Sequence, residues 1–253
     1  MAHKSRKRFG QNFLVDHQVI NQIISTITPK NNDTIVEIGP GKGALTFPLA
    51  EYLNHLHVIE IDRDLISILY GKNNHKITVY NSDALTFDFN QFSSKIRVVG
   101  NLPYNISSPL LFHLLNFRSN IVDMTFMLQK EVVERIVASP GGKSYGRISV
   151  IMQAFFDTEL MFTVPKESFD PQPKIESAIL YLKTKKEPLV QNQKSLENIV
   201  KLAFSHRRKT LKNCLKLTLN QSQTQIDLSQ RAEMLSLKNF VTLMNDYEKQ
   251  NRN

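Results

Sequence analysis

The sequence predicts an α/β protein with a small, helical and basic C-terminal domain. Through most of the chain, short runs of β-branched residues alternate with amphipathic helical patterns, which is typical of βαβ units and a parallel sheet. Beyond the charged segment 183–188 the strand patterns almost stop, and apolar residues such as Ile199, Leu202 and Ala203 recur at helical spacing. We therefore expect a larger domain over residues 1–184 and a smaller one over 189–253, with a charged linker between them.

The elements of the larger domain can be placed in order. A helix is predicted over 17–27, with Asp16 as its N-cap and five apolar residues on one face. Strands are expected at 34–38, 57–61, 76–80, 96–100 and 122–128, and helices at 44–53, 65–69, 110–115, 130–137 and 147–155. The segments 158–164 and 177–182, separated by a proline-rich stretch, are expected to form a closing pair of strands.

Composition narrows the class of partner. The 253-residue chain has a formal net charge of +9, which favours a polyanion, with nucleic acid preferred over an anionic membrane surface. The lone Cys214 excludes an internal disulfide, and no cluster of Cys and His has zinc-ligand spacing, so we expect no metal. The basic N-terminus lacks the apolar stretch of a secretory signal, and no segment is long enough to span a membrane. A cytoplasmic location fits these features.

A glycine loop follows the first predicted strand of the sheet. Gly39, Gly41 and Gly43 would let the backbone approach a ligand closely, although many such turns need glycine for steric reasons alone. Glu60 ends the next strand about 20 residues on, the spacing at which an acid accepts ribose hydroxyls. NAD and S-adenosylmethionine both fit, but the loop lacks the dinucleotide spacing, which weakens the NAD interpretation. Asp83 could accept the adenine amine or merely cap a turn.

The segment Asn101–Pro109 distinguishes between these cofactors. An aromatic amine is a poor nucleophile because its lone pair is delocalised into the ring. The Asn101 side-chain oxygen and the Leu102 carbonyl, held by Pro103, could accept the two amine hydrogens and turn the lone pair toward a methyl donor. Tyr104 could stack on the base. The alternative is an Asn-capped helix start with a buried tyrosine.

Five motifs together resemble the ribosomal RNA adenine dimethyltransferase family, and within it the bacterial small-subunit (16S) type. They are Phe9–Leu14, Glu37–Thr46, Asn101–Pro109, Phe169–Ala178 and Phe204–Leu211, which together extend over nearly the whole chain. The resemblance implies a Rossmann-like, seven-stranded S-adenosylmethionine-dependent methyltransferase domain. It also implies dimethylation of two adjacent adenosines in the 3′-terminal hairpin of 16S rRNA, within the small ribosomal subunit or its precursor.

The resemblance further implies site residues. The cofactor would be held by Asn12, Leu14, Gly39, Glu60, Asp83 and Asn101. The reacting adenine would lie against Asn101, Leu102, Pro103, Tyr104 and Phe169. For Phe169, an ordinary hydrophobic contact beneath the loop is the alternative. No metal is implied, and a monomer is the simpler expectation for an enzyme that docks on a large RNA particle.

Two basic runs are candidate RNA contacts. They comprise Arg6, Lys7 and Arg8 near the start, and Arg207, Arg208 and Lys209 near the end. Contacts to phosphate would set affinity and register more than sequence choice. Solvated surface charge is the alternative.

Three other functions stay open. A resistance-type 23S rRNA adenine methyltransferase shares the same catalytic parts, and the segment Phe204–Leu211 favours the small-subunit type over it. A DNA adenine methylase would more often carry proline where Leu102 stands. The protein could also be chiefly a small-subunit assembly factor whose catalysis is secondary.

Overall fold

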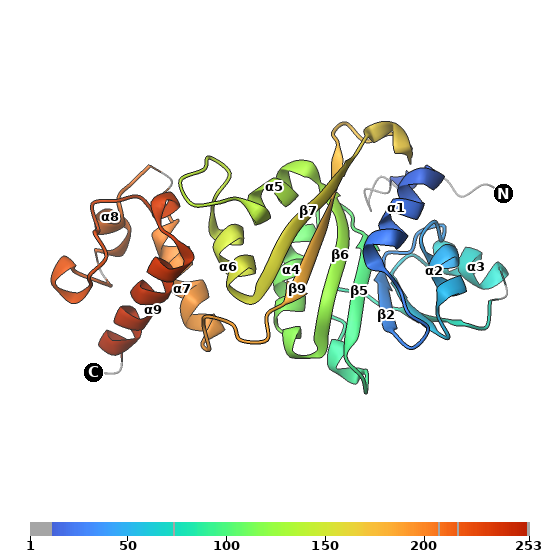
Figure 1. The fold of residues 1–253 in the computed structure, drawn as a ribbon, viewed down its shortest axis with the longest axis horizontal. Helices are drawn as coiled ribbons and strands as arrows, with labels where there is room; N and C mark the ends of the chain where they lie inside the picture. Colours follow the sequence, from blue (N-terminus) through green and yellow to red (C-terminus); the bar gives the residue numbers. More distant parts are fainter. Residues whose placement is uncertain (1–11, 73, 207, 217, 252–253) are drawn as a thin grey trace. The chain divides into compact units, whose positions relative to one another are not determined.

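A computed structural model describes residues 12–72, 74–206, 208–216 and 218–251 (Figure 1). The chain forms two compact units. One comprises the residues up to Val133 together with Glu159–Thr184, and the other comprises Glu134–Thr158 and Lys185 onward.

The first unit is built on the seven-stranded sheet found in the described residues. Its order is β4-β3-β2-β5-β6-β9-β7, where pairs β2/β3, β3/β4, β2/β5 and β5/β6 are parallel and β6/β9 is antiparallel. The strands are β2 (Thr34–Ile38), β3 (Leu56–Glu60), β4 (Ile77–Asn81), β5 (Ile96–Asn101), β6 (Ile121–Gln129), β7 (Phe156–Val164) and β9 (Ser177–Thr184). The predicted α/β class is confirmed, and the pair 158–164 and 177–182 does form neighbouring strands.

The strand order reverses beside β2. From β2 the chain continues outward through β3 and β4 on one side, then returns to β5 and β6 on the other. The crevice at the carboxyl ends of β2 and β5 is therefore a topological switch point, where open α/β sheets bind ligands.

Helices follow the strands, and their starts have local causes. They are α1 (His17–Ile27), α2 (Thr46–Tyr52), α3 (Arg63–Gly71), α4 (Ser107–Leu115), α5 (Lys130–Val137) and α6 (Arg147–Phe155). Asp16 caps α1 as predicted, because its side chain accepts hydrogen bonds from the amides of Gln18 and Val19. Helix α2 begins at Thr46, two residues later than the predicted start at residue 44, and its N-cap residue Leu45 makes no side-chain capping hydrogen bond.

One hydrophobic core joins α1 and α2 to the sheet. Ile23 and Ile27 of α1 and Leu49 of α2 are buried in the same cluster as Ile35 of β2 and Val99 of β5. The apolar face predicted for residues 17–27 is thus the face that α1 turns to the core. This packing fixes the helix beside the strands whose ends carry the candidate site.

A second, two-stranded sheet was not predicted. Strand β1 (Phe13–Leu14) pairs antiparallel with β8 (Phe169–Asp170), so that Leu14 lies opposite Phe169. The pairing continues through the amide of Val15, which donates to the Ser168 carbonyl at 2.9 Å. The sheet therefore joins two segments that the resemblance assigns to the cofactor side and the base side of one site.

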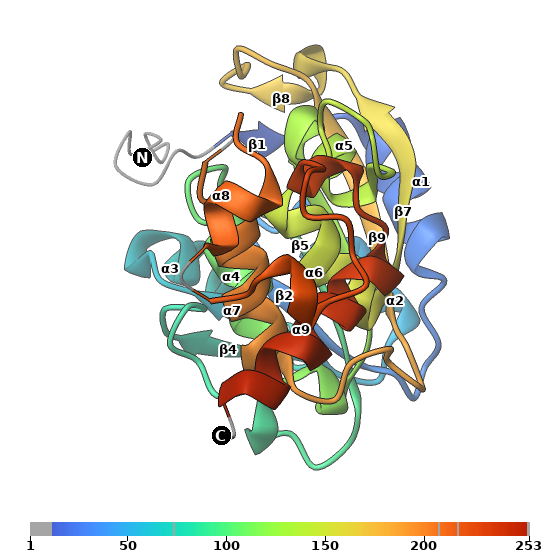
Figure 2. The same cartoon turned by 90° about the vertical axis from the view of Figure 1, so that its left-hand side faces the viewer.

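The second unit contains the C-terminal helices, seen most clearly in Figure 2. They are α7 (Gln193–Ala203), α8 (Leu211–Leu215) and α9 (Leu237–Asn251). The rings of Phe204 and Phe240 stack with centroids 5.7 Å apart, and Phe240 is fully buried. None of the helices in the described residues combines the length and apolar composition that a membrane crossing requires.

Residues 134–158 group with this second unit. Helix α6 packs against α7 and α9, and the amide of Gly141 donates to the Glu233 carbonyl at 2.7 Å. The expected division into 1–184 and 189–253 therefore differs from the two compact units in this stretch, because the side chains of α6 find their partners on helices far along the chain. The division stays a prediction for independently folding domains.

Candidate active site

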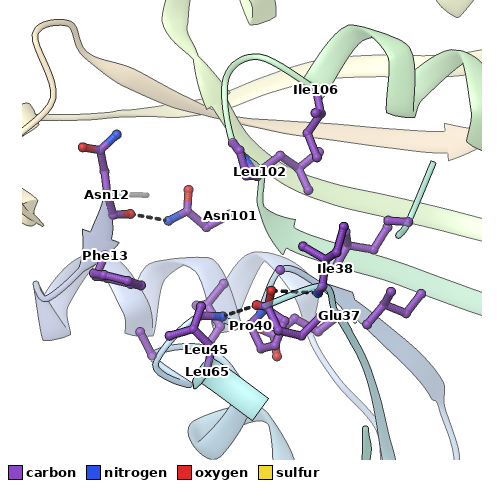
Figure 3. Close-up of a pocket in the computed structure, with 18 of the residues that line it drawn as sticks. Asn12, Phe13, Glu37, Ile38, Pro40, Leu45, Leu65, Asn101, Leu102 and Ile106 are labelled. Atoms are coloured by element: carbon purple, nitrogen blue, oxygen red, sulfur yellow. Dashed lines mark hydrogen bonds between the residues drawn. The ribbon is translucent and has the colours of Figure 1, made fainter. Parts of the chain in front are cut away.

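A cavity of about 330 Å³ lies at the carboxyl ends of the strands (Figure 3). Its walls come from the glycine loop after β2, Glu60 at the end of β3, residues 82–85 after β4 and residues 101–106 after β5. The segments containing Asn12 and Phe169 also line it. The volume lies within the range of small-molecule sites. The cavity therefore coincides with the switch point of the sheet and brings together the cofactor and target residues predicted from sequence.

Two glycines lie at places beside the cavity where neighbouring groups come too close for a larger residue. Gly41 has a φ of 59°, and a Cβ atom there would lie 3.3 Å from the ring of Phe13. Gly100, in β5, faces the Ile38 carbonyl of β2 so closely that any Cβ would overlap it. A side chain at Gly100 would force the ends of β2 and β5 apart. The Phe13 ring, with the Lys42 ammonium 4.4 Å from its centroid, covers the loop.

Glu60 is held by backbone amides. Its Oε1 accepts hydrogen bonds from the amides of Ile61 and Asp62, both at 2.9 Å, and its Oε2 accepts one from Gly41 at 3.3 Å. Burial raises the pKa of the Glu60 carboxyl, while these backbone bonds act in the opposite direction. The contact between Glu60 and Gly41 ties the acid to the glycine loop. Both features singled out in the sequence thus belong to one wall of the cavity.

Glu37 is a polar residue of the cavity wall for which the sequence predicted no role. It lies in the apolar run of β2, is 2% exposed, and its Oε2 has no hydrogen-bond partner among the described residues. Burial raises the pKa of Glu37 to about 8. The nearby Thr46 hydroxyl acts in the opposite direction, and the Glu60 carboxyl adds to the rise. An unpartnered buried acceptor suits a ligand that brings a donor or a positive charge. An acidic residue just before a glycine loop is the signal that could have indicated it.

The raised pKa of Glu37 predicts how stability depends on pH. The folded carboxyl keeps its proton up to about pH 8, whereas an ordinary carboxyl loses it near 4.5. The folded state therefore binds more protons across this window, and its stability falls as pH rises through it. Glu37→Gln should remove that loss of stability. The variant should therefore have the melting temperature of the wild type at about pH 5 and a higher melting temperature than the wild type at about pH 8.5. If the melting temperatures of the variant and the wild type differ by the same amount at both pH values, this environment for Glu37 is contradicted.

Asp83 follows β4 and lines the cavity. Its Oδ1 accepts a hydrogen bond from the Leu85 amide at 2.9 Å, so the turn-capping role expected as the alternative is present. A contact with an adenine amine would depend on Oδ2. The two roles are therefore compatible in one side chain.

The Asn101 side chain has a fixed orientation. Its Nδ2 donates to the Asn12 carbonyl at 3.2 Å, as Figure 3 shows. Because the amide group is planar, this bond turns Oδ1 away from Asn12, where it can act as an acceptor. A residue near the N-terminus thus sets the geometry of a residue at the end of β5.

The residues after Asn101 form a tight turn. The Leu102 amide donates to the Met127 carbonyl at 3.2 Å, and the Ile106 amide donates to the Pro103 carbonyl at 3.2 Å. Leu102 is 1% exposed, which fixes its backbone in the cavity wall. Tyr104 is half-buried, and its hydroxyl lies 2.9 Å from that of Ser177. An Asn-capped helix start is not found at Asn101, because α4 begins at Ser107 without a side-chain cap.

Phe169 lies in the cavity wall and is 5% exposed. Its position opposite Leu14 in the β1/β8 sheet carries it there. Its burial is also what the alternative, an ordinary hydrophobic contact, requires. The geometry is thus available for a contact with a ligand, and that role stays a prediction.

The basic candidates are only partly described. Arg208 and Lys209 are exposed, between α7 and α8. Arg6, Lys7, Arg8 and Arg207 lie outside the described residues. Within the described part of the chain, no group of three or more His, Cys, Asp or Glu could hold a metal ion.

The sequence matches the family described as ribosomal RNA adenine dimethylase over residues 2–249. The chain belongs to this family. It is 51% identical over 256 residues to a protein of Saccharophagus degradans named Ribosomal RNA small subunit methyltransferase A, covering 96% of this chain and 95% of that protein. A protein of the same name from Nitrosospira multiformis is 48% identical over 255 residues, covering 98% of each chain.

Solved structures of two related enzymes resemble the fold over nearly its whole length. A dimethyladenosine transferase from Plasmodium falciparum superposes with a TM-score of 0.82 at 26% identity, covering 94% of this chain and 98% of that one. The 23S rRNA methyltransferase ErmE superposes with a TM-score of 0.75 at 25% identity, covering 94% and 100%. This chain therefore shares its fold with both enzymes.

Proposed function

We infer that the protein is an S-adenosylmethionine-dependent enzyme that dimethylates adenosine N6 in the 16S rRNA of the small ribosomal subunit. Membership of the adenine dimethylase family and relatives about half identical over their full length support the reaction and its rRNA substrate. The observation that carries the proposal is the Asn101 amide, which is held by Asn12 at the edge of the cavity with its oxygen available as an acceptor. Two adjacent adenosines in the 3′-terminal hairpin are the proposed targets.

The cavity fits the cofactor. Glu60 at the end of β3 would accept the ribose hydroxyls, and Asp83 would accept the adenine amine. The unpartnered Oε2 of Glu37 supplies an acceptor for the ammonium group at the methionine end, beside Gly39. Asn12 and Leu14 would close over the ligand from the β1 side. When bound, S-adenosylmethionine supplies an electrophilic methyl group, which moves to N6 while a neutral thioether and one proton leave.

The chain contributes chiefly by orienting the target amine. The base would be unstacked into the cavity, as enzymes that act on a base require. The Asn101 Oδ1 and the Leu102 carbonyl would accept the two amine hydrogens, which localises the nitrogen lone pair and directs it to the methyl group. Tyr104 and Phe169 would hold the ring plane. Positioning of the reactants and exclusion of water would provide the acceleration, and a strong general base would not be required.

The second transfer makes a stricter demand on the same groups. A monomethylated amine has one hydrogen left, so only one of the two acceptors can keep its bond. The methyl already present must then occupy the place of the other hydrogen. Base position therefore matters more in the second step than in the first.

The setting of the reaction is also proposed. An rRNA substrate implies the compartment in which ribosomes are made, so we propose a cytoplasmic enzyme. We propose that it acts as a monomer on the small subunit or its precursor.

Exposed cations beyond α7 are proposed to bind RNA phosphates. The double variant Arg208→Ala, Lys209→Ala should weaken binding to small-subunit rRNA, and its plot of log affinity against log salt should be shallower by about 0.7 to 0.9 for each phosphate that is no longer neutralised. The matched control Lys30→Ala, Lys95→Ala removes two charges from exposed positions before β2 and β5. Equal losses of affinity in both variants would instead indicate a general effect of net charge.

Substrate choice tests the proposed function. The experiment offers the enzyme radiolabelled S-adenosylmethionine with unmethylated small subunits, large-subunit rRNA or duplex DNA. Methyl transfer to the small subunit alone is the expected result. Preferential transfer to large-subunit rRNA would favour the activity named for ErmE, to which the fold is similar. Transfer to duplex DNA would overturn the RNA assignment.

A further inference from the structure

Ser177 is a buried serine that contacts a residue of the cavity wall. It is fully buried, and its Oγ lies 2.9 Å from the hydroxyl of Tyr104. Tyr104 is among the described residues that line the cavity, whereas Ser177 is not. Any effect of Ser177 on the site is therefore transmitted through its hydrogen bond with Tyr104.

Both partners of this hydrogen bond have fixed backbones. Ser177 is the first residue of β9 and lies opposite Gln129 in the antiparallel pairing with β6. On the other side, the Tyr104 carbonyl accepts a hydrogen bond from the Ser107 hydroxyl at 3.0 Å, at the first residue of α4. The Tyr104 side chain is thus anchored at its backbone by α4 and at its far end by the sheet. Its ring has little freedom to tilt.

Burial raises the pKa of the Tyr104 phenol, although its bond to Ser177 acts in the opposite direction. The phenol therefore keeps its proton at neutral pH. The contact is a bond between two neutral hydroxyls, in which either can donate. Removing either hydroxyl leaves the other one without this partner.

We propose that Ser177 is a positioning residue that holds Tyr104 against the target base and thereby sets how completely the enzyme converts monomethyladenosine to dimethyladenosine. This proposal rests on the proposed function. In the first transfer either amine hydrogen can meet either acceptor, so a small tilt of the base is tolerated. In the second, a single arrangement places the methyl and the remaining hydrogen correctly. A loosened Tyr104 should therefore slow the second transfer more than the first.

The hydrogen bond can be removed from either end. Ser177→Ala and Tyr104→Phe each delete one hydroxyl, and the double variant deletes both. Single-turnover rates of the two transfers to small subunits would be measured together with the ratio of mono- to dimethyladenosine by mass spectrometry. Each single variant should slow the second transfer by about threefold to tenfold, the range of one hydrogen bond, and should slow the first by less. The double variant should be no slower than the slower single variant.

Two further variants separate positioning from a general loss of structure. Ser177→Thr keeps the hydroxyl and should restore the wild-type product ratio. Thr125→Val removes a different buried hydroxyl, from β6 of the same sheet, which has no partner among the described residues. It should leave the product ratio unchanged. Affinity for S-adenosylmethionine should be the same in every variant.

The outcomes distinguish this proposal from the proposed function. If the wild type makes dimethyladenosine on small subunits and Ser177→Ala gives the same product ratio, the role of Ser177 is overturned. Additive effects in the double variant would overturn it as well, since they would mean that the serine acts independently of Tyr104. If the wild type itself transfers no methyl group to small-subunit rRNA, the proposed function fails instead.

Discussion

Replacing Asn101 by alanine is expected to lower kcat by at least about a hundredfold while leaving affinity for S-adenosylmethionine and RNA within about threefold. The amide oxygen is proposed to contact the amine hydrogen as the lone pair localises, an interaction made in full only in the transition state. The amide nitrogen bonds to the Asn12 carbonyl, so the variant also loses the bond that holds the N-terminal segment to β5. A small change in cofactor affinity is therefore expected beside the large change in rate.

Single-turnover methyl transfer and equilibrium binding of S-adenosylmethionine would measure the two effects of Asn101→Ala separately. Asn90→Ala, at an exposed position in the turn before β5, is the matched control and should behave as the wild type. An Asn101→Ala enzyme that methylates at the wild-type rate would contradict the orientation mechanism. A variant that has lost cofactor binding as well would place Asn101 in ligand binding and leave its role in the chemical step unsupported.

Replacing Arg97 by alanine is expected to lower the free energy of unfolding by about 3 kcal/mol, the lower end of the cost of removing one partner from a buried ion pair, because Arg97 itself is only partly buried. The Arg97 Nε donates to both oxygens of Asp123, at 2.9 and 3.1 Å, and its Nη1 lies 2.8 Å from Asp33 Oδ2. Its Nη2 donates to the Ile27 carbonyl at 2.6 Å, at the end of α1. Burial acts to lower the pKa of Arg97, but its bonds to the two aspartates outweigh burial and raise it.

The size of this effect follows from what Arg97→Ala leaves behind. The Asp123 side chain, 9% exposed, would lose its guanidinium partner, and the last carbonyls of α1 would lose a donor. Urea unfolding of the variant would measure the loss. Arg63→Ala, at an exposed position in the first turn of α3, removes the same side chain and should change stability by no more than about 0.5 kcal/mol. Equal stability changes in the two variants would contradict the structural role of Arg97.

The sheet and its main helices could be predicted from sequence because their signals are local. The apolar faces of residues 17–27 and the β-branched runs at 34–38 and 122–128 each bury a continuous surface, and the structure has elements at these places. The β1/β8 sheet could not be predicted, since each strand has two residues and the pairing joins segments that are far apart in the sequence. The grouping of residues 134–158 with the C-terminal helices likewise depends on contacts that no local pattern encodes.

The parts of the candidate site that could be predicted are those where the backbone at a strand end requires a particular type of residue. The glycine loop and Glu60 fall together in the cavity wall, as their positions after neighbouring parallel strands require. Glu37 belongs to one of the motifs but its role was not predicted. Its place just before the glycine loop was the available signal, and that signal alone does not distinguish a buried acceptor from a solvated strand end. Ser177 also belongs to a motif, but its contact with Tyr104 was not predicted because the two residues are 73 positions apart. Contacts between residues so far apart in the sequence can be identified only from the three-dimensional arrangement of the strands.

The most direct test is to map methylated adenosines by mass spectrometry on 16S rRNA from unmethylated small subunits incubated with S-adenosylmethionine, with and without the protein. We expect N6,N6-dimethyladenosine at two adjacent positions of the 3′-terminal hairpin, only when the protein is present, and far less in the same time with Asn101→Ala. Methylation at other positions, or an unmodified hairpin alongside an active enzyme on another RNA, would contradict the proposed function.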